Sequence, residues 1–470
     1  MDSVTDIAPL PTSTPAAVLA PATGPSAALR LLHAACWFVL IVGSYRFQRG
    51  LVRVTGWTRI GRGFAERRWE RVHAKNARRF HDAAVALGGL WLKIGQMLSV
   101  MGSFLPGVWT STLGRLQDRV PPRSWRTIAE ALDAAYGRPV ESVFAELSKD
   151  AVAAASLGQV HKARLHDGRE VAVKVLYPDV RARFRTDLKV VGWVIAVLRR
   201  YFPVAELERV HQQLAQMLAA ESDLRVEAAA LERMGDAFEA APDVVLPRVV
   251  KELSGPSVLV MDWIDGVRIT DRERLAELGL APHDAARKLL DVFFRQVFEH
   301  RFVHADPHPG NFLVQKTAQG GVKIALLDLG SAAPVRDSLV RGLVQVLGAA
   351  FSKNEDGVLV GLETMGFVSA SGDRAQLALA IKRGLGGLDL GMGGVDKSAL
   401  SSFDRKEAKE LARAITYPEG WLPLERAIML VAATCATEAP DLQPAQVAFP
   451  HVARFMASQA RRQTTQPGLA

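Results

Sequence analysis

The sequence predicts an α+β fold of two lobes that is preceded by a helical extension. Apolar residues recur at three- and four-residue spacing through residues 50–117, which is typical of helices. The pattern changes at residues 151–175, where two short apolar runs flank a glycine turn, as in a pair of strands. Beyond residue 330 the spacing is helical again. Strands in one part of a chain and helices in others are typical of the α+β class.

The 470 residues have the composition of a globular protein, with 49% hydrophobic and 23% charged residues. The net charge of +9 is local, because 11 Lys and Arg residues against 2 Glu lie between Arg46 and Arg79. The two cysteines, Cys36 and Cys435, lie far apart and suggest neither a disulfide framework nor a metal site. A reducing compartment is therefore expected.

The N-terminal part has two segments of different character. Residues 1–28 are rich in Pro, Ala, Thr and Ser and are predicted to be a disordered tail. Residues 29–79 combine an apolar helix with the basic segment. The uncharged run 31–45 would be roughly 22 Å long as a helix, which is shorter than the ~30 Å hydrocarbon core of a bilayer. We expect a helix seated at a membrane, with its basic flank facing anionic lipid head groups. The alternatives are a helix packed on the rest of the chain and a true membrane span.

Residues 80–125 are predicted to form a helical extension that carries the sequence Lys93-Ile94-Gly95-Gln96. Lysine and glutamine on a helix usually face solvent, so Lys93 and Gln96 become candidate site residues only in the context of the other motifs. Pro121 and Pro122 end this region.

Lys174 lies inside the apolar strand-like run Val171–Val175, which follows a turn at Gly168. Because a lysine in a buried strand is costly unless it is paired, Lys174 is a candidate site residue. The alternative is a lysine at a strand edge. The segment before it reads Ala153-Ala154-Ala155-Ser156 and contains a single glycine, Gly158. We expect this segment to be stiffer than a glycine-rich loop.

A helix is predicted from about Val204 to Gly235, and it carries three acidic residues, Glu221, Asp223 and Glu227. Asp223 and Glu227 are four residues apart and would share one face. Residues 248–260 are predicted to form two more strands. Acidic residues on helices are often only solvated, which is the alternative for this group.

The chain is organised around the segment F-V-H-A-D-P-H-P-G-N at Phe302–Asn311. It places Asp306 and Asn311 five residues apart, and a predicted hairpin with a Gly-Gly turn leads from it to Asp328. An Asp that orients or deprotonates a hydroxyl, together with an Asn and a second Asp that bind Mg²⁺, forms the catalytic set of kinase-type phosphoryl transfer. Lys174 matches the strand lysine that contacts the ATP phosphates in that chemistry.

The two lobes therefore correspond to a bilobal protein-kinase-like fold. Residues 126–265 are predicted to be its N-lobe and residues 266–470 its C-lobe, with extra helices at the C-terminal end. No A-P-E sequence follows Gly330, so the usual activation segment for protein substrates is not recognisable.

Two segments of the N-lobe are expected to contact the nucleotide. The loop residues Ala154, Ala155 and Ser156 would cover the phosphates. The hinge between the lobes, at 261–266, would meet the adenine through backbone groups of Asp262 and Ile264.

Taken together, these segments resemble the UbiB/AarF family of atypical protein-kinase-like proteins, which is associated with coenzyme Q and other isoprenoid-lipid metabolism. The resemblance covers roughly residues 78–456. It is specific because separate motifs occur in the family's order: K-I-G-Q at Lys93, L-Q-D-R-V-P-P at Leu116, A-A-A-S-L-G-Q-V-H at Ala153, V-A-V-K-V at Val171, E-S-D-L-R-V-E-A at Glu221, H-A-D-P-H-P-G-N at His304 and D-L-G at Asp328. One departure is Leu329, which stands where the family usually has Phe.

The resemblance implies a role for each catalytic candidate. Lys174 would contact phosphate and pair with Glu227. Asp306 would be the catalytic-loop acid, and Asn311 and Asp328 would hold Mg²⁺.

The resemblance also implies a regulatory group. The K-x-G-Q helix, with Lys93 and Gln96, would fold across the active cleft, and Lys93 would meet Glu221 and Asp223. That arrangement would block a peptide substrate and leave ATP accessible. The alanine-rich loop would disfavour ordinary protein-kinase activity.

The expected function is Mg²⁺-dependent ATP hydrolysis or atypical phosphoryl transfer, coupled to quinone or other lipid metabolism. The expected cofactors are ATP or ADP and Mg²⁺. The expected partners are a membrane surface and lipid- or quinone-biosynthesis proteins, without nucleic acid, at the inner face of a bacterial membrane in the cytoplasm. Two alternatives are a small-molecule kinase of the aminoglycoside or choline kinase type and a nucleotide-gated scaffold without catalysis.

Overall fold

The computed structural model divides the chain into two units, Met1–Gly95 with Pro178–His211 and Gln96–Tyr177 with Gln212–Ala470. The structure describes residues 27–55, 59–100, 106–117, 122–155, 157–198, 219, 221–352, 354–368, 374, 378 and 418–465. The predicted disordered tail lies outside the described residues except for its last two positions. Ser156 and the side chains of Lys93 and Gln96 also lie outside them.

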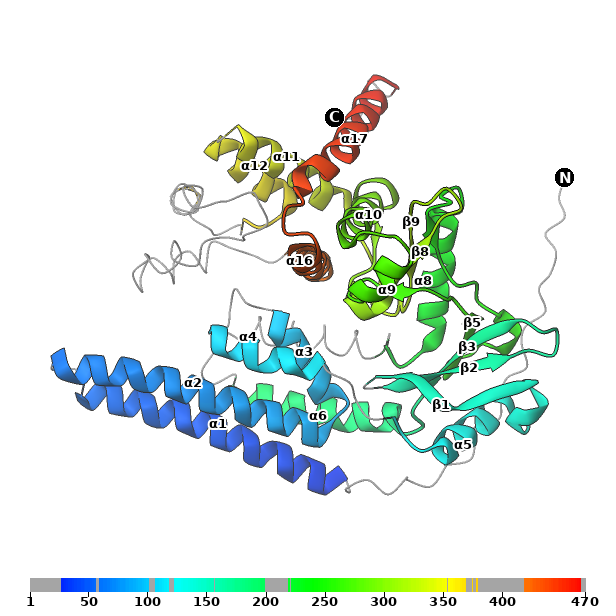
Figure 1. Ribbon diagram of the computed structural model, residues 1–470. Helices are drawn as coiled ribbons and strands as arrows, with labels where there is room; N and C mark the ends of the chain where they lie inside the picture. Colours follow the sequence, from blue (N-terminus) through cyan, green and yellow to red (C-terminus); the bar gives the residue numbers. More distant parts are fainter. Residues whose placement is uncertain are drawn as a thin grey trace, which may run out of the picture. The chain divides into compact units, whose positions relative to one another are not determined.

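The described part of the first unit is helical (Figure 1). It contains α1 (Ala27–Thr55), α2 (Arg59–Leu87), the start of α3 (Leu90–Val100) and α6 (Val180–Leu198). Ala34, Leu87 and Val190 form an apolar contact between α1, α2 and α6. Gly88 and Gly89 have left-handed φ angles of 62° and 51°, which end α2 and permit the turn into α3.

Polar side chains fix α1 against α2. Ser44 Oγ donates to Asn76 Oδ1 at 3.0 Å, and Arg68 Nε donates to Gln48 Oε1 at 2.9 Å. Gln48 and Asn76 are fully buried, so their polar groups depend on these bonds. The contacts determine which face of α1 points away from α2. Among the described helices, α1 included, none has both the length and the apolarity that a membrane crossing requires.

The second unit contains an antiparallel four-stranded sheet in the order β1-β2-β3-β5. Its strands are β1 (Glu146–Ala154), β2 (Gly158–Arg164), β3 (Glu170–Leu176) and β5 (Val258–Asp262). Helix α5 (Trp125–Tyr136) packs against β3, and α8 (Leu224–Ala237) packs against β5. Before the sheet lie α4 (Gly107–Leu113) and 3₁₀ turns at Gly114–Gln117 and Val140–Ser142. The predicted strand pair with its turn at Gly168, where φ is 89°, is confirmed.

Two predictions for this region are wrong. The predicted helix from 204 to 235 is not continuous, because the backbone of Asp223 is extended and α8 begins at Leu224. The Asp223 carboxylate accepts a hydrogen bond from the Arg225 N–H group at 3.1 Å and so caps the helix N-terminus. Asp223 therefore does not share a helical face with Glu227. Residues 204–218 of the predicted helix lie outside the described residues.

The second error concerns residues 248–260, for which two strands were predicted. Only β5 is a strand there; the preceding residues form a 3₁₀ turn at Lys251–Leu253 and one isolated bridge between Val249 and Met261. The 3₁₀ turn takes the chain out of the extended conformation directly after Val250, so the pairing with β5 stops at one bridge.

A second sheet, in the order β4-β9-β8-β6, carries the segment that leads to Asp328. Its strands are β4 (Val244–Val245), β6 (Val267–Arg268), β8 (Phe312–Lys316) and β9 (Val322–Leu326). The predicted hairpin between β8 and β9 is confirmed, with Gly320 in the turn at a φ of 84°. A short pair, β7 (Phe302–Val303) and β10 (Ala333–Pro334), joins the two ends of this region.

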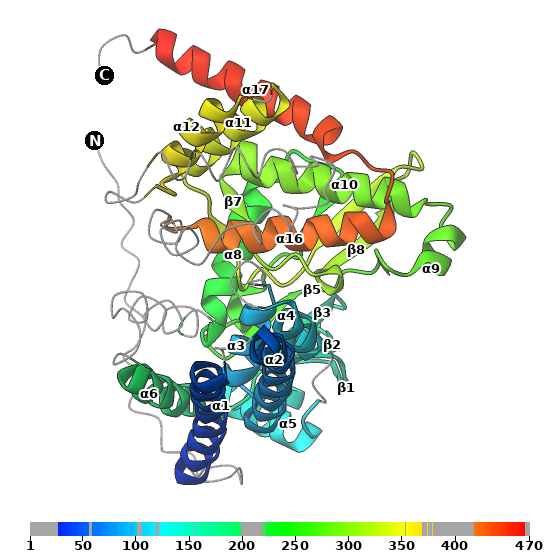
Figure 2. The ribbon, with the colours of Figure 1, turned by 90° about the vertical axis from the view of Figure 1, so that its left-hand side faces the viewer.

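Helices form the rest of the described part of the second unit, as the sequence predicts for the residues after Gly330. They are α9 (Arg272–Glu277), α10 (Pro282–Arg295), a π-helical turn at Gln296–His300, a 3₁₀ turn at Pro309–Asn311, α11 (Asp337–Phe351), α12 (Glu355–Met365), α16 (Trp421–Glu438) and α17 (Pro444–Thr465). Helix α10 lies between α16 and α17 and contacts both (Figure 2). Their apolar faces form one core cluster with α11 and α12, which includes Leu290, Leu339 and Leu424.

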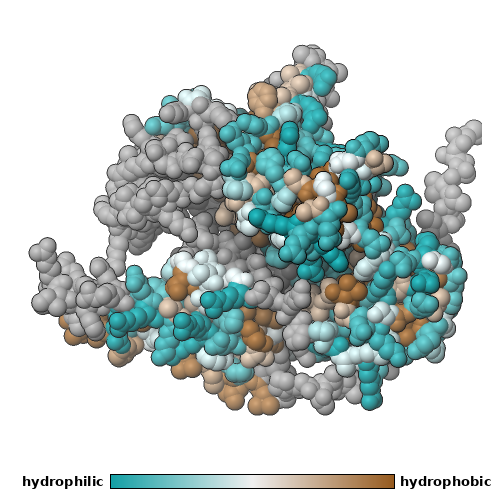
Figure 3. Space-filling model, viewed as in Figure 1, coloured by the Kyte–Doolittle hydropathy of each residue, from teal (hydrophilic) through white to brown (hydrophobic). Residues whose placement is uncertain are grey.

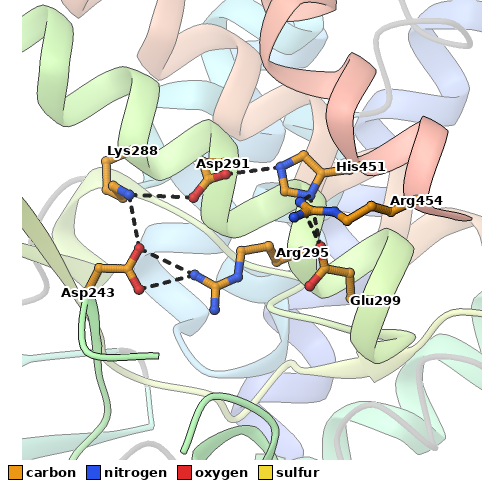
Figure 4. A network of polar contacts seen from close by, with 7 residues as sticks. All are labelled: Asp243, Lys288, Asp291, Arg295, Glu299, His451 and Arg454. Atoms are coloured by element: carbon orange, nitrogen blue, oxygen red, sulfur yellow. Dashed lines mark hydrogen bonds and ion pairs between the residues drawn. The ribbon is translucent and has the colours of Figure 1, made fainter. Parts of the chain in front are cut away.

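A network of charged side chains also anchors α17 to α10 (Figure 4). Lys288 on α10 donates to Asp243 at 2.9 Å and lies 3.6 Å from Asp291. Asp291 is 3.0 Å from His451 Nε2 on α17, and Glu299 is 3.1 Å from His451 Nδ1. The buried imidazole is thus held between two carboxylates.

Candidate active site

Lys174 forms the centre of a cluster of charged side chains in the second unit. Its Nζ atom lies 2.8 Å from both carboxylate oxygens of Glu227 and 3.0 Å from Asp328 Oδ1. Strand β3 positions the lysine between β2 and β5, and α8 presents Glu227 from the first turn after its cap. The side chains of Lys174 and Glu227 are 15% and 4% exposed, so water screens their attraction little.

The cluster shifts the pKa values of its members. Burial alone lowers the pKa of Lys174, but the carboxylates of Asp328 and Glu227 outweigh burial and raise that pKa above its ordinary value. Burial raises the pKa of Glu227, and Asp328 adds to the rise, although Lys174 acts against it. Two carboxylates around one ammonium leave an excess of negative charge, which an added cation would relieve.

The loop from His304 to Asn311 is held by hydrogen bonds at several points. The His304 N–H group donates to the buried Gln296 Oε1 at 2.8 Å. Asn311 Nδ2 donates to the Asp306 carbonyl at 3.0 Å, which turns the amide oxygen of Asn311 in the other direction. The Leu327 N–H group donates to the Asn311 carbonyl at 2.9 Å. Since Leu327 directly precedes Asp328, this bond places the backbone of Asn311 beside that of the acidic turn.

Asp328 has a φ angle of 51°, which is uncommon for a residue with a side chain. Its Oδ1 atom lies 3.4 Å from the Gly330 nitrogen. A Cβ atom at position 330 would lie 3.2 Å from Glu227 Oε2, so the glycine allows the acidic turn to approach α8. The Leu329 side chain is fully buried, so this position suits an apolar residue.

Sequence reasoning missed Arg426. This residue of α16 places Nη2 2.7 Å from Asp306 Oδ1, although 120 residues separate the two in sequence. Both side chains are largely buried. No local motif surrounds Arg426 in the helical segment 421–438, so the sequence carries no signal that would pair it with Asp306.

The alanine-rich loop is closed on itself. The Ala155 N–H group donates to the Gly158 carbonyl at 2.8 Å, just after β1 ends at Ala154. A Cβ atom on Gly158 would lie 2.2 Å from the Val175 carbonyl oxygen, so only glycine fits there. The Ala155 N–H group is thus already bonded within the loop.

The predicted hinge has an available backbone donor. The N–H groups of Asp262 and Trp263 donate to the carbonyls of Arg248 and Glu170. Among the described residues, no acceptor is bonded to the N–H group of Ile264. This N–H group would be available to a base at the hinge, and the adenine contact itself stays a prediction.

The predicted regulatory residues belong to different units. Lys93 lies on α3 in the first unit, whereas Glu221 and Asp223 lie in the second. Asp223 also forms an ion pair with Arg225. Glu221 is close enough to Glu227 to raise its pKa. The pairing of Lys93 with these acids stays a prediction.

The donor set suits Mg²⁺. Asp328 offers a carboxylate and Asn311 an amide oxygen, which are the ligand types that hard cations prefer. Within the described residues there is no cluster of three or more His, Cys, Asp or Glu side chains that would bind a metal alone. Nucleotide-bound Mg²⁺ needs only one or two protein ligands, because the phosphates and water supply the rest. The residues present therefore fit Mg²⁺ bound together with a nucleotide.

A strand lysine paired with a helix glutamate, an acid and an Asn on one loop, and a second acidic turn beside them define a protein-kinase-like protein. Residues 115–360, more than half of the chain, match the ABC1 atypical kinase-like domain. The chain belongs to this family. The predicted resemblance and the predicted α+β kinase-like fold are thereby confirmed.

Two curated relatives illustrate the extent of the similarity. An ABC1 family protein of Schizosaccharomyces pombe is 30% identical over 310 residues, which cover 64% of this chain and 58% of the relative. The AarF domain-containing protein kinase 1 of Xenopus laevis is 32% identical over 260 residues, which cover 55% of this chain and 50% of the relative. The chain thus spans about half the length of such relatives. A solved complex of a Mycobacterium tuberculosis protein with erythromycin matches 80% of this chain and 98% of that chain, at 24% identity and a TM-score of 0.49.

Proposed function

We propose that this chain binds ATP together with Mg²⁺ and hydrolyses it, or transfers its γ-phosphoryl group, at a membrane surface. The observation that supports this most strongly is the contact of Lys174 with both Glu227 and Asp328. Kinase-type phosphoryl transfer needs a phosphate-binding lysine paired with a glutamate, and a metal-binding aspartate placed at the same site.

Each residue has one task in the proposed reaction. Lys174, oriented by Glu227, binds oxygens of the α- and β-phosphates. Asp306 orients the acceptor hydroxyl, or a water molecule, and accepts its proton. Asn311 and Asp328 hold Mg²⁺, which neutralises charge on the β- and γ-phosphates when it is bound.

The nucleotide is proposed to lie between the alanine-rich loop and the hinge. The backbone of Asp262 and Ile264 binds adenine, and Ala154, Ala155 and Ser156 cover the phosphates. Because the Ala155 N–H group already donates to Gly158, this loop offers fewer donors to phosphate than a glycine-rich loop. The limited cover supports an atypical reaction rather than ordinary protein phosphorylation.

Access to the cleft is proposed to be restricted by the K-x-G-Q segment, in which Lys93 and Gln96 act with Glu221 and Asp223. This restriction would exclude a peptide and admit a nucleotide. The acceptor is then water or a small molecule of lipid or quinone metabolism, and the protein partners are enzymes of such a pathway.

Exposed apolar side chains along α1 support membrane association. Leu32, Val39, Phe47 and Val54 recur every seven or eight residues and are all well exposed. Figure 3 shows hydrophobic side chains along the lower edge, where α1 lies. Such side chains can insert into the interface of a membrane when the helix lies in its plane.

Basic residues accompany the exposed apolar face. Arg46, Arg49 and Arg53 are exposed in the second half of α1. Each basic residue near an anionic leaflet adds about 1 kcal/mol to binding. The combination favours the inner, anionic leaflet of a cytoplasmic membrane over an uncharged lipid surface.

The proposed function is tested by ATP turnover of the purified chain with Mg²⁺. Turnover is measured without vesicles, with phosphatidylcholine vesicles, and with vesicles that also contain phosphatidylglycerol. We expect turnover that rises only with the anionic vesicles and is lost in Asp328→Asn. Asp337→Asn, which removes a carboxylate that pairs with Arg301 elsewhere in the same unit, is the control.

Two outcomes would contradict the proposal. Binding of ATP without turnover under any condition would favour a nucleotide-gated scaffold. Phosphorylation of soluble amino alcohols or aminoglycosides without any effect of vesicles would favour a small-molecule kinase.

A further inference from the structure

The contact between Arg426 and Asp306 joins helix α16 to the catalytic loop. Arg426 Nη2 lies 2.7 Å from Asp306 Oδ1, and the two side chains are 19% and 24% exposed. Within the described residues, Arg426 is the one basic side chain in an ion pair with Asp306. Under the proposed function Asp306 orients the acceptor, so the guanidinium would lie beside the oxygen that forms the new bond to phosphorus.

The guanidinium of Arg426 has N–H donors beyond the one that contacts Asp306. Arginine carries five N–H donors in a planar fork, and the described contact with Asp306 uses one. Arg426 Nε is buried and has no hydrogen-bond partner among the described residues. A buried donor without a partner is unfavourable in the folded protein, and an additional acceptor would remove that cost.

The catalytic loop itself supplies no comparable cation. His304 is buried, and His308 Nδ1 accepts a hydrogen bond from the Gly310 N–H group at 3.2 Å. Lys174 is already shared between Glu227 and Asp328. Phosphoryl transfer spreads negative charge over the equatorial oxygens in the transition state, and an arginine supplied in cis can neutralise that charge.

We propose that Arg426 is a further catalytic residue, which donates to the γ-phosphoryl oxygens in the transition state while it holds the Asp306 carboxylate toward the acceptor. This inference rests on the proposed function. In the reaction, the bond between the γ-phosphorus and the bridging oxygen breaks, and its electron pair leaves on ADP. A bond forms between phosphorus and the acceptor oxygen, whose proton passes to Asp306.

The inference predicts that Arg426 acts on the transition state more than on nucleotide binding. In Arg426→Ala, kcat should fall by about 10³-fold, the lower end of the range for a catalytic arginine. The dissociation constant for ADP with Mg²⁺ should change by less than about threefold, because the ground state does not need the guanidinium. Arg426→Lys should restore only part of kcat, since lysine lacks the planar fork.

A measurement that does not depend on turnover separates this role from a structural one. ADP with Mg²⁺ and aluminium fluoride imitates the transferring phosphoryl group, and its affinity relative to ADP with Mg²⁺ alone is measured by calorimetry. We expect this ratio to exceed tenfold in the wild type and to approach one in Arg426→Ala. Arg272→Ala is the matched control, because it removes another arginine that pairs with an acid, in this case Glu438 of α16, the helix that carries Arg426. It should keep the wild-type ratio.

The outcomes distinguish failure of the proposed function from failure of the proposed role of Arg426. A wild type that neither turns over ATP nor binds the fluoride complex more tightly would overturn the proposed function and this inference with it. A wild type that does both, beside an Arg426→Ala variant with unchanged ratio and kcat, would overturn this inference alone. A kcat that rises in Arg426→Ala would also overturn it, because Arg426 would then restrain Asp306. If Arg426→Ala unfolds, the same comparison is made with Arg426→Lys, for which an unchanged ratio and kcat would contradict the inference.

Discussion

The ammonium of Lys174 lies 2.8 Å from both oxygens of the Glu227 carboxylate, with only 4% of the glutamate exposed. The pair connects the middle of the first sheet to the first turn of α8. Because Lys174 also contacts Asp328, at 3.0 Å, it joins the sheet to the end of the β8–β9 hairpin. The three charges together set the geometry of the proposed nucleotide site.

Removal of Lys174 should cost both stability and nucleotide affinity. Lys174→Ala leaves Glu227 buried beside a second carboxylate, and breaking a buried pair in this way costs about 3–5 kcal/mol. Arg164→Ala is the control, since Arg164 on the neighbouring strand pairs with Glu146 at 3.5 Å in a solvent-exposed position. The control should cost ~1 kcal/mol or less. Urea unfolding measures the first effect and ATP titration the second; equal losses in both variants would refute the assigned role of Lys174.

Gly158 should not tolerate a side chain. A Cβ atom there would lie 2.2 Å from the Val175 carbonyl, so Gly158→Ala must push β2 away from β3 and with it displace Lys174. We expect a loss of more than about 2 kcal/mol in unfolding free energy. Gly255→Ala, where no atom lies within 4 Å of the added carbon, should change it by less than ~1 kcal/mol. Thermal and urea unfolding of both variants measure these losses. A Gly158→Ala variant as stable as the wild type would contradict the described strand register.

The network between α10 and α17 should make stability fall in acid. Burial alone would raise the pKa of Asp243, but Lys288 and Arg295 outweigh burial and hold that pKa below its ordinary value of 3.8. Burial would likewise raise the pKa of Asp291, but His451 outweighs it and holds that pKa below 3.8 as well. A carboxyl whose pKa is lower in the folded state stabilises the fold fully above its unfolded-state pKa. That contribution is lost as the pH falls through the folded-state value.

The variant Asp291→Asn tests the direction of this pH dependence. It should be less stable than the wild type at pH 6, and the two unfolding free energies should converge as the pH falls below the ordinary value of 3.8. Asp284→Asn, on an exposed position of the same helix, should follow the wild type throughout. A constant difference between Asp291→Asn and the wild type from pH 6 to about pH 2 would show that the carboxylate charge contributes nothing.

Charge on the exposed face of α1 should weaken membrane binding. Phe47→Asp removes apolar area and adds a negative charge beside Arg46, so binding to phosphatidylglycerol-containing vesicles should fall by at least about tenfold. Val360→Asp, at an exposed apolar position on α12, should bind like the wild type. Co-sedimentation with the vesicles at low and high salt measures the apolar and the electrostatic contributions to binding. Equal binding of the two variants would mean that α1 is not the membrane-binding element.

Local patterns were enough to predict the elements that hold most of the site. The alternation in Val171–Val175 predicts β3 because one face of the strand is fully buried, and the Gly-Gly turn predicts the β8–β9 hairpin. The apolar periodicity did not predict where α8 begins, because a local hydrogen bond sets that position. The Asp223 side chain caps α8 and so interrupts the expected helix. The pairing of Arg426 with Asp306 joins residues 120 positions apart, and no local pattern encodes such a contact.

Asp328 is proposed to link Mg²⁺ to the nucleotide at the site of Lys174. The most direct test is the equilibrium affinity for ATP with and without Mg²⁺, measured by calorimetry for the wild type and Asp328→Asn. We predict that Mg²⁺ raises the wild-type affinity at least about tenfold, because the metal joins the phosphates to the protein, and has little effect in the variant. The same dependence on Mg²⁺ in both proteins would contradict this role of Asp328.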